Sequence, residues 1–367
     1  MIRYAVIGAG WISQEAFLPG VHTTDNSVVT AIVSGNTEAA EKLAAFHDVP
    51  YVCGYDGYDG YDDLLASGRI DAVYIALPNS LHADYAIRAA KAGKHILVEK
   101  PLANTVEEAE AMIAAAREAD VFLMTAYRLH TEPGNLDALR CIRAGEIGKP
   151  IAVQTNFCFQ NAAGNNRLKA EHLGGALQDA GVYCVNAVRH IFGEEPTEAR
   201  AQHHWHDDDP RFTEVPATTT ATLNFPSGGV AQFVASFAIR ETAMFRVMGT
   251  KGWIELDPGF RFEYGTTMRV GYDNEIETTL FPQVDQFGGQ TSYFSDCIKT
   301  GKEPVSNGEE GLADMRARIA IEEAAPAGKV VQIDSPARDH YPEMSMERRC
   351  PVTDRRLVLP KAAPYLG

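Results

Sequence analysis

The first 126 residues alternate short apolar runs with helical patterns, and this alternation constrains the fold more than any other feature. The runs that we interpret as strands cover residues 4–7, 28–33, 72–76, 95–98 and 121–124. Alanine-rich patterns with a helical period separate them, as over residues 106–119. Strands that alternate with helices form βαβ units, which build a parallel sheet. We therefore predict an α/β fold whose first domain, residues 1–126, is a parallel-stranded Rossmann sheet.

After Tyr127 the pattern changes to longer strand-like segments with few helices between them. These segments cover residues 151–157, 217–225, 230–237 and 243–248, and helical patterns return at 292–299 and 311–325. Such an order favours a predominantly antiparallel, open sheet. We predict a second α/β domain over residues 127–335 and an extended tail over 336–367, on the surface or on a partner subunit. The open sheet face needs a cover, so we expect a homo-oligomer, a dimer or larger.

Charge and cysteine content exclude several classes of function. The net charge is −16, which argues against nucleic acid and against an anionic membrane surface as partners. The six cysteines form no Cys-x-x-Cys pair, so neither a zinc cluster nor a dithiol site is indicated, and a reducing compartment is the simpler interpretation. The first residues run directly into a strand and no apolar run reaches membrane-span length. We therefore expect no targeting peptide, no membrane span and a cytoplasmic location.

A glycine-rich turn follows the first predicted strand and opens a helix. It reads Gly8-Ala9-Gly10-Trp11-Ile12-Ser13, a G-x-G-x-x-S pattern. Gly8 permits a tight turn and Gly10 lets a pyrophosphate approach the backbone. The helix N-terminus, with Trp11 and Ile12, supplies N–H donors, and the small Ser13 preserves close helix–strand packing. The pattern and its place in a βαβ unit predict a dinucleotide site.

The end of the second predicted strand indicates which dinucleotide binds. It reads Ser34-Gly35-Asn36, without the carboxylate that would hold the ribose 2′-hydroxyl of NAD. Serine, the backbone turn and asparagine can donate to a 2′-phosphate, and Lys42 lies on the following helix. These features favour NADP(H). The alternative, that the segment is only a turn and both cofactors bind, remains open.

Three residues form a candidate acid–base set. Lys100 lies in Glu99-Lys100-Pro101 at the end of a predicted strand, an unusual place for a lysine without a partner. Asp179 and Tyr183 are four residues apart in a helical segment that ends at Gly193, so they share one face. A tyrosine can remove a hydroxyl proton when a nearby cation favours its phenolate. The alternatives are a carboxylate placed by the helix dipole and a half-buried structural tyrosine.

Two segments contain residues of the kinds that bind metal ions. Residues 55–62 repeat Tyr-Asp-Gly but lack the spacing of a calcium loop, and residues 203–209 place His203 and His204 next to each other, where a strand would point them apart. We interpret both segments as solvated loops and predict no metal site.

Several stretches resemble the glucose–fructose oxidoreductase/inositol dehydrogenase (Gfo/Idh/MocA) family, and its glucose–fructose oxidoreductase branch most. They are residues 5–10, 76–82, 99–101, 127–128, 174–181 and 308–311. The resemblance implies that Lys100, Asp179 and Tyr183 flank the nicotinamide and that Pro101 follows a cis peptide bond. It also implies cofactor or substrate contacts from a further group. These are Leu77, Pro78, Asn79, His82, Glu99, Arg128 and Arg167.

The resemblance implies an NADP-dependent sugar oxidoreductase. Tyr183 would remove the C1 hydroxyl proton of a cyclic aldose, giving an aldonolactone, while Lys100 holds Tyr183 and Asp179 orients the sugar. The same cofactor would then reduce a second sugar to an alditol. One alternative is an ordinary NAD(P)-dependent aldose or dihydrodiol dehydrogenase that releases NAD(P)H. Another is a non-enzymatic NADP(H)-sensing regulator.

Overall fold

The computed structural model describes residues 1–56, 60–338 and 340–359. The chain forms two compact units. The first contains residues 1–131, residues 284–312 and the described part of the C-terminal segment from Arg348; the second contains residues 132–283 and 313–347. This division differs from the predicted one, because residues 284–312 and the last described segment join the first unit. Periodicity describes local structure and carries no information about which distant segments pack together.

The first unit contains a six-stranded parallel sheet in the order β3-β2-β1-β4-β5-β6. Its strands are β1 (Ile2–Ile7), β2 (Ser27–Val33), β3 (Tyr51–Cys53), β4 (Ala72–Ile75), β5 (His95–Val98) and β6 (Leu123–Thr125). All four residues of β4 are buried, as expected for a strand covered on both faces. The predicted Rossmann sheet is confirmed, although the three-residue strand β3 escaped the sequence analysis.

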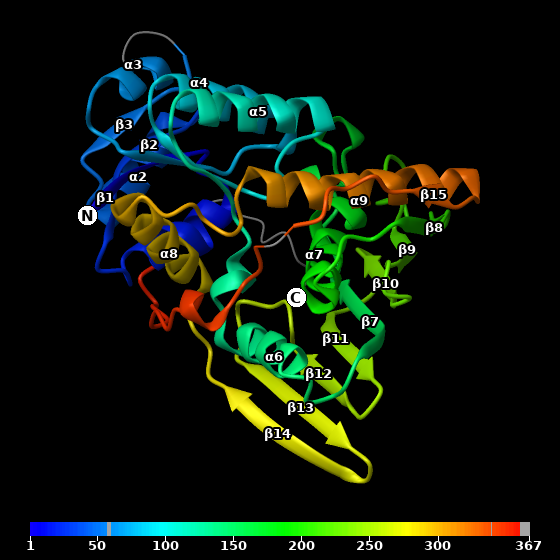
Figure 1. The fold of residues 1–367 in the computed structure, drawn as a ribbon. Helices are drawn as coiled ribbons and strands as arrows, with labels where there is room; N and C mark the ends of the chain where they lie inside the picture. The colour runs from blue at the N-terminus through cyan, green and yellow to red at the C-terminus, as the bar shows by residue number, and fades with distance from the viewer. Residues whose placement is uncertain (57–59, 339, 360–367) are drawn as a thin grey trace. The chain divides into compact units, whose positions relative to one another are not determined.

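Helices cover this sheet (Figure 1). Those of the first unit are η1 (Ser13–Phe17), α1 (Leu18–Val21), α2 (Thr37–His47), α3 (Tyr61–Ala66), η2 (Asn79–Leu81), α4 (His82–Lys91), α5 (Val106–Glu118), η3 (Arg128–Thr131) and α8 (Gln286–Thr300). Helices α4 and α5 pack together beside β4 to β6, whereas α8 packs on α1, β1 and β2. Within the described ranges, no helix combines the length and the apolar character needed to cross a bilayer.

The aspartate-rich repeat at residues 55–62 is only partly the solvated loop that we predicted. Residues 57–59 lie outside the described residues. Tyr61, however, begins α3, is fully buried, and donates its hydroxyl to the carbonyl of Tyr85 at 2.9 Å. The guanidinium of Arg88 lies 5.0 Å from the ring centres of both tyrosines. A low-complexity sequence therefore supplies part of the core, because one repeat places its aromatic ring on an inward helical position.

The second unit contains a nine-stranded open sheet in the order β14-β13-β12-β11-β7-β10-β9-β8-β15. Its strands are β7 (Pro150–Cys158), β8 (Glu198–His204), β9 (Thr218–Asn224), β10 (Val230–Ser236), β11 (Thr242–Gly249), β12 (Trp253–Asp257), β13 (Thr266–Tyr272), β14 (Glu275–Phe281) and β15 (Val331–Gln332). Only β7 and β10 pair in parallel; the other neighbours are antiparallel. The predicted open, mostly antiparallel sheet is confirmed.

The histidine-rich segment is a loop only in part. His203 and His204 end strand β8, and the ring Nδ1 of His203 lies 2.9 Å from the hydroxyl of Thr219 on the neighbouring strand. The loop prediction was therefore wrong for these two residues, because cross-strand pairing fixes them in the sheet. Residues 205–209 follow the strand as loop and turn.

One face of this sheet carries the helix with the candidate acid–base residues. The helices of the second unit are α6 (Pro133–Arg143), η4 (Asn166–Leu168), η5 (Ala170–His172), η6 (Leu177–Gly181), α7 (Val182–Phe192), η7 (Met344–Met346) and the part of α9 (Gly308–Ala327) from Ala313 onward. Helix α7 packs on β7 and β10. Its buried Arg189 pairs with Glu195 at 2.6 Å and with Asp314 on α9. Breaking such a buried cluster costs about 3–5 kcal/mol, so it fixes the position of α7.

Candidate functional site

The turn after β1 can only be made by glycine at its first position. Gly8 has φ +98°, and a Cβ there would lie 2.6 Å from the carbonyl oxygen of Ala76 at the end of β4. A Cβ on Gly10, in contrast, would meet no atom within 4 Å. The backbone of Gly10 therefore borders open space, as binding of a pyrophosphate against the loop requires. This loop fits the phosphate groups of a dinucleotide.

Two side chains from the following helix hold the loop. The hydroxyl of Ser13 donates to the carbonyl of Gly8 at 2.6 Å, and Nε2 of Gln14 donates to the carbonyl of Ala9 at 2.6 Å. Both side chains are buried. The hydrogen bonds occupy two oxygens whose partial negative charge would otherwise oppose a phosphate. Ser13 therefore holds the loop as well as allowing close helix–strand packing. The sequence analysis missed Gln14, because no known motif marks this position.

The turn after β2 forms the start of α2. Asn36 is its N-cap, with the side-chain oxygen accepting from the N–H of Ala39 at 3.0 Å, and the hydroxyl of Ser34 accepts from the N–H of Asn36 at 3.2 Å. The ring of Tyr55 would lie 3.3 Å from a Cβ on Gly35. The turn carries no carboxylate and ends at a helix N-terminus, which suits the 2′-phosphate of NADP.

Lys42 belongs to the same helix but binds within it. Its ammonium lies 2.8 Å from the carboxylate of Glu38, and both side chains are well exposed. This pair neutralises the acidic residue in the first turn of α2.

The segment after β4 is held by a buried histidine. His82 is fully buried, with Nδ1 2.9 Å from the carbonyl oxygen of Pro101 and Nε2 3.1 Å from that of Leu77. Burial lowers the pKa of the imidazole, and the hydrogen bonds to these carbonyls oppose that shift. His82 thus links the Leu77-Pro78-Asn79 turn to the end of β5, which is a positional role.

Lys100 follows β5 in a charged cluster within the first unit. The Lys100–Pro101 peptide bond is cis, which confirms the prediction. Burial raises the pKa of Glu99, although the charges of Lys100 and Arg128 oppose this rise. The hydroxyl of Tyr74 donates to Glu99 at 2.7 Å. Tyr74 was missed by the sequence analysis, because it lies inside a uniformly apolar strand.

Arg128 is also anchored within the first unit. It is buried and donates to the side-chain oxygen of Gln286 on α8. Nothing in the sequence links these two residues, which are 158 positions apart.

The second unit brings Asp179 and Arg167 together. The Nε of Arg167 lies 2.7 Å from Oδ2 of Asp179, with both side chains mostly shielded. The loop that carries Arg167 approaches the helix because Gly174 lacks a side chain; a Cβ there would lie 2.5 Å from the carbonyl oxygen of Arg167. Asp179 itself lies in η6, a turn of π-helix that leads into α7. Such turns are frequent at functional sites.

Tyr183 lies in the first turn of α7 and is half-buried. Its ring packs edge-on against Phe157, with centroids 5.2 Å apart, and lies 6.2 Å from Phe260. The aromatic packing fixes the ring, so that the position of the hydroxyl follows from α7 and β7. Of the predicted site residues, Lys100 belongs to the first unit, and Arg167, Asp179 and Tyr183 belong to the second.

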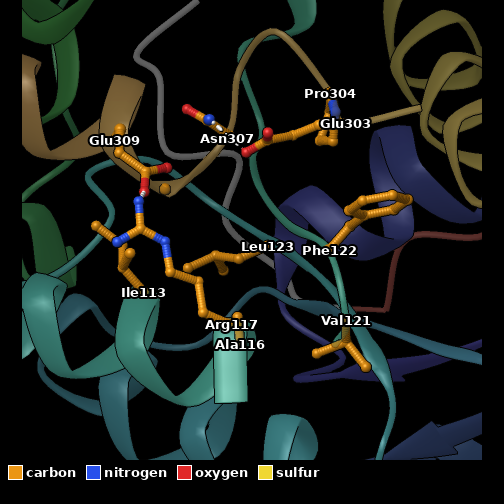
Figure 2. Close-up of a pocket in the computed structure, with 11 residues that line it drawn as sticks. Ile113, Ala116, Arg117, Val121, Phe122, Leu123, Glu303, Pro304, Asn307 and Glu309 are labelled. Carbon is orange, nitrogen blue, oxygen red and sulfur yellow. Dashed lines mark hydrogen bonds and ion pairs between the residues drawn. The ribbon is translucent and has the colours of Figure 1, made fainter. Parts of the chain in front are cut away.

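A small pocket lies on the first unit (Figure 2). It measures about 40 Å³, and its lining includes Arg117 of α5, paired with Glu309 of α9. A water molecule takes up about 30 Å³, so the pocket has room for water and none for a dinucleotide. None of the predicted site residues lines it.

Family models match both halves of the chain. The model described as the oxidoreductase family with an NAD-binding Rossmann fold matches residues 2–127. The model of the GFO/IDH/MocA C-terminal domain matches residues 136–255. The chain belongs to the Gfo/Idh/MocA oxidoreductase family. This membership confirms the predicted resemblance, and the loop geometry agrees with the dinucleotide site of the family.

Relatives within the Gfo/Idh/MocA family act on sugars. The chain is 33% identical over 345 residues to the D-xylose 1-dehydrogenase [NADP(+)] of Haloarcula marismortui, covering 91% of this chain and 93% of the relative. Its fold is similar to that of the aldose-aldose oxidoreductase of Caulobacter crescentus, solved with glycerol, at a TM-score of 0.85 and 35% identity over 90% of this chain and 99% of that one. A 3-ketoreductase of Actinomadura kijaniata, solved with TDP-benzene and NADP, gives 0.80 and 28%, covering 88% and 98%.

We expect alanine to reduce stability at the first loop glycine and cofactor affinity at the second. Gly8→Ala forces a side chain into a left-handed backbone against Ala76, so the variant should lose about 1–3 kcal/mol of unfolding free energy. Gly10→Ala meets no atom of the protein and should fold normally, yet bind NADPH at least about tenfold more weakly because the methyl group occupies phosphate space. Denaturant unfolding and NADPH titration measure the two effects. Normal NADPH affinity in Gly10→Ala would contradict this placement of the phosphates.

Proposed function

We propose that this NADP-dependent sugar oxidoreductase oxidises a cyclic aldose at C1 to an aldonolactone and reduces a second sugar to an alditol with the same cofactor. The observation that supports the proposal most is the combination of Lys100, Asp179 and Tyr183 with a cofactor loop free of carboxylate at the 2′-phosphate position. The similarity to the Caulobacter aldose-aldose oxidoreductase supports the second half-reaction.

In the proposed oxidation, NADP+ held at the Gly8–Gly10 loop would supply the acceptor for the hydride that leaves C1 of the aldose. The phenolate of Tyr183 accepts the proton of the C1 hydroxyl, and the C1–O bond becomes the carbonyl of the lactone. In this proposal Lys100 would bind the C1 hydroxyl and Tyr183. Asp179, held by Arg167 at 2.7 Å, orients the sugar. The two electrons lost by the sugar are those of the transferred hydride.

The proposed reduction uses the same residues in reverse. An open-chain aldose or ketose takes the hydride at its carbonyl carbon, and protonated Tyr183 gives its proton to the carbonyl oxygen. Lys100 donates a hydrogen bond to that oxygen as negative charge develops on it. Tyr183 thus returns to its starting state, and the whole cycle needs no external oxidant or reductant.

A second candidate function is an ordinary aldose dehydrogenase that releases NADPH after each turnover. The 33% identity to the D-xylose 1-dehydrogenase of Haloarcula marismortui favours it. The same three residues would perform the oxidation, and the two candidates differ only in the fate of the reduced cofactor.

The role of Tyr183 is tested by removing only its hydroxyl. Tyr183→Phe keeps the ring that packs against Phe157 and Phe260, so the fold and NADPH binding should persist. The rate of aldose-dependent NADPH formation should fall by about 10² or more. Phe157→Leu alters the same packing without touching the hydroxyl and serves as the control. Unchanged turnover in Tyr183→Phe would refute the proposed base.

We also propose that the second unit forms a homo-oligomer through the open face of its sheet. That face holds a hollow of about 570 Å³, lined largely by polar side chains that include the neighbouring pair Gln154 and Gln232. Open sheets are normally covered by a further layer. At the edge of the same sheet, strand β14 exposes Ile276 and Leu280 to 62% and 74%, more apolar surface than a strand edge usually presents.

Light scattering after size exclusion should therefore give at least twice the chain mass of 40.0 kDa. The double variant Gln154→Glu, Gln232→Glu places two neighbouring carboxylates in the face and should shift the protein towards monomer. A monomeric wild type at micromolar concentration would contradict the proposal.

A further inference from the structure

The C-terminal segment of the first unit ends beside the dinucleotide loop. We propose that residues 348–359 form a strap that holds the phosphate loop in its binding conformation, and that Gln14 and Arg356 are positioning residues for NADP(H). The inference concerns cofactor affinity alone and does not depend on which sugar reacts.

Gln14 joins the strap to the loop. Its side-chain oxygen accepts the backbone N–H of Leu359 at 2.6 Å, while its Nε2 donates to the carbonyl of Ala9 at 2.6 Å. Only 2% of the residue is exposed, so the amide is fixed in one orientation. One buried amide therefore connects the end of the strap to the residue between Gly8 and Gly10. Loss of either hydrogen bond leaves a buried polar group unpaired, which makes this orientation stable.

Arg356 neutralises an acidic side chain in the helix that follows the phosphate loop. Glu15 lies in the helix that follows the loop, and its carboxylate would oppose an anionic ligand bound at that helix start. Nη1 of Arg356 lies 2.5 Å from Oε1 of Glu15, whose side chain is 19% exposed. The guanidinium thus neutralises the nearest acidic group in the helix and keeps the local potential favourable for phosphate.

The remainder of the strap is anchored to the first unit along its length. The N–H of Arg348 donates to Thr131 at 3.0 Å, and its guanidinium binds Asp296 on α8 at 2.9 Å. The carbonyl of Cys350 accepts the N–H of Asp285 at 2.9 Å. Arg355 donates to the carbonyl of Phe46 at the end of α2, at 2.9 Å. The strap is therefore packed against the first unit along its length, and Leu359 at its end binds the side chain that holds the phosphate loop.

Two single variants test the two links by NADPH titration without sugar, followed through intrinsic tryptophan fluorescence. Gln14→Leu keeps the side-chain size and removes both hydrogen bonds. Arg356→Ala leaves Glu15 uncompensated. Each should raise the dissociation constant for NADPH about threefold to tenfold, the range for one hydrogen bond or one helix-terminal charge. The KM for NADP+ should rise by a similar factor, and by more than the turnover number changes. Arg117→Ala removes a comparable surface pair with Glu309, remote from the loop, and should leave the affinity unchanged.

A rescue variant separates the charge effect from general loosening of the fold. Glu15→Gln in the Arg356→Ala background removes the uncompensated carboxylate and should restore most of the affinity. The loss in Arg356→Ala should also shrink at high salt, because screening weakens the repulsion. Affinity within twofold of wild type in both single variants would overturn the proposal. Failure of the rescue, with normal thermal stability, would overturn the charge role of Arg356.

Discussion

The cofactor-binding unit depends on the contact between Gly8 and the end of β4. Strand β1 lies in the middle of the sheet, between β2 and β4, so the chain must leave it through a turn bordered by Ala76. Only a residue without Cβ can take this path. The turn places the start of the next helix at the carboxyl end of the sheet, where open α/β sheets bind their ligands. Ser13, Gln14 and the strap then hold a geometry that Gly8 makes possible.

In the second unit, a fixed helix and the turn before it carry the proposed site residues Asp179 and Tyr183. Helix α7 is held by Arg189, whose charge is balanced by Glu195 and Asp314 away from water. At the start of this helix, a π-turn and Gly174 bring Asp179 and the Arg167 loop within hydrogen-bond distance. The buried cluster therefore fixes the helix, and the irregular turn brings together two of the proposed site residues.

The sequence allowed the parallel sheet, the phosphate loop and the helix of Asp179 and Tyr183 to be predicted, because each has a local pattern. The short strand β3 and the edge strand β14 lack such a pattern: β3 has three residues, and β14 is exposed on nearly every position. Packing of α8 and the strap within the first unit joins residues up to 345 positions apart. The partners Gln14–Leu359 and Arg128–Gln286 depend on that tertiary packing, so no local motif could identify them. The pair Tyr74–Glu99 depends on the pairing of β4 with β5, which the sequence does not specify at the level of single residues.

The central claim, hydride transfer between two sugars through one NADP(H), is tested most directly with an aldose deuterated at C1. The protein is incubated with this aldose, an unlabelled second sugar and NADP+ equal in concentration to the enzyme. Mass spectrometry should find deuterium on carbon in the alditol, in an amount many times that of the cofactor, together with an equal amount of aldonolactone. Lactone limited to one equivalent of NADP+, with no labelled alditol, would contradict the two-sugar cycle and leave the ordinary dehydrogenase.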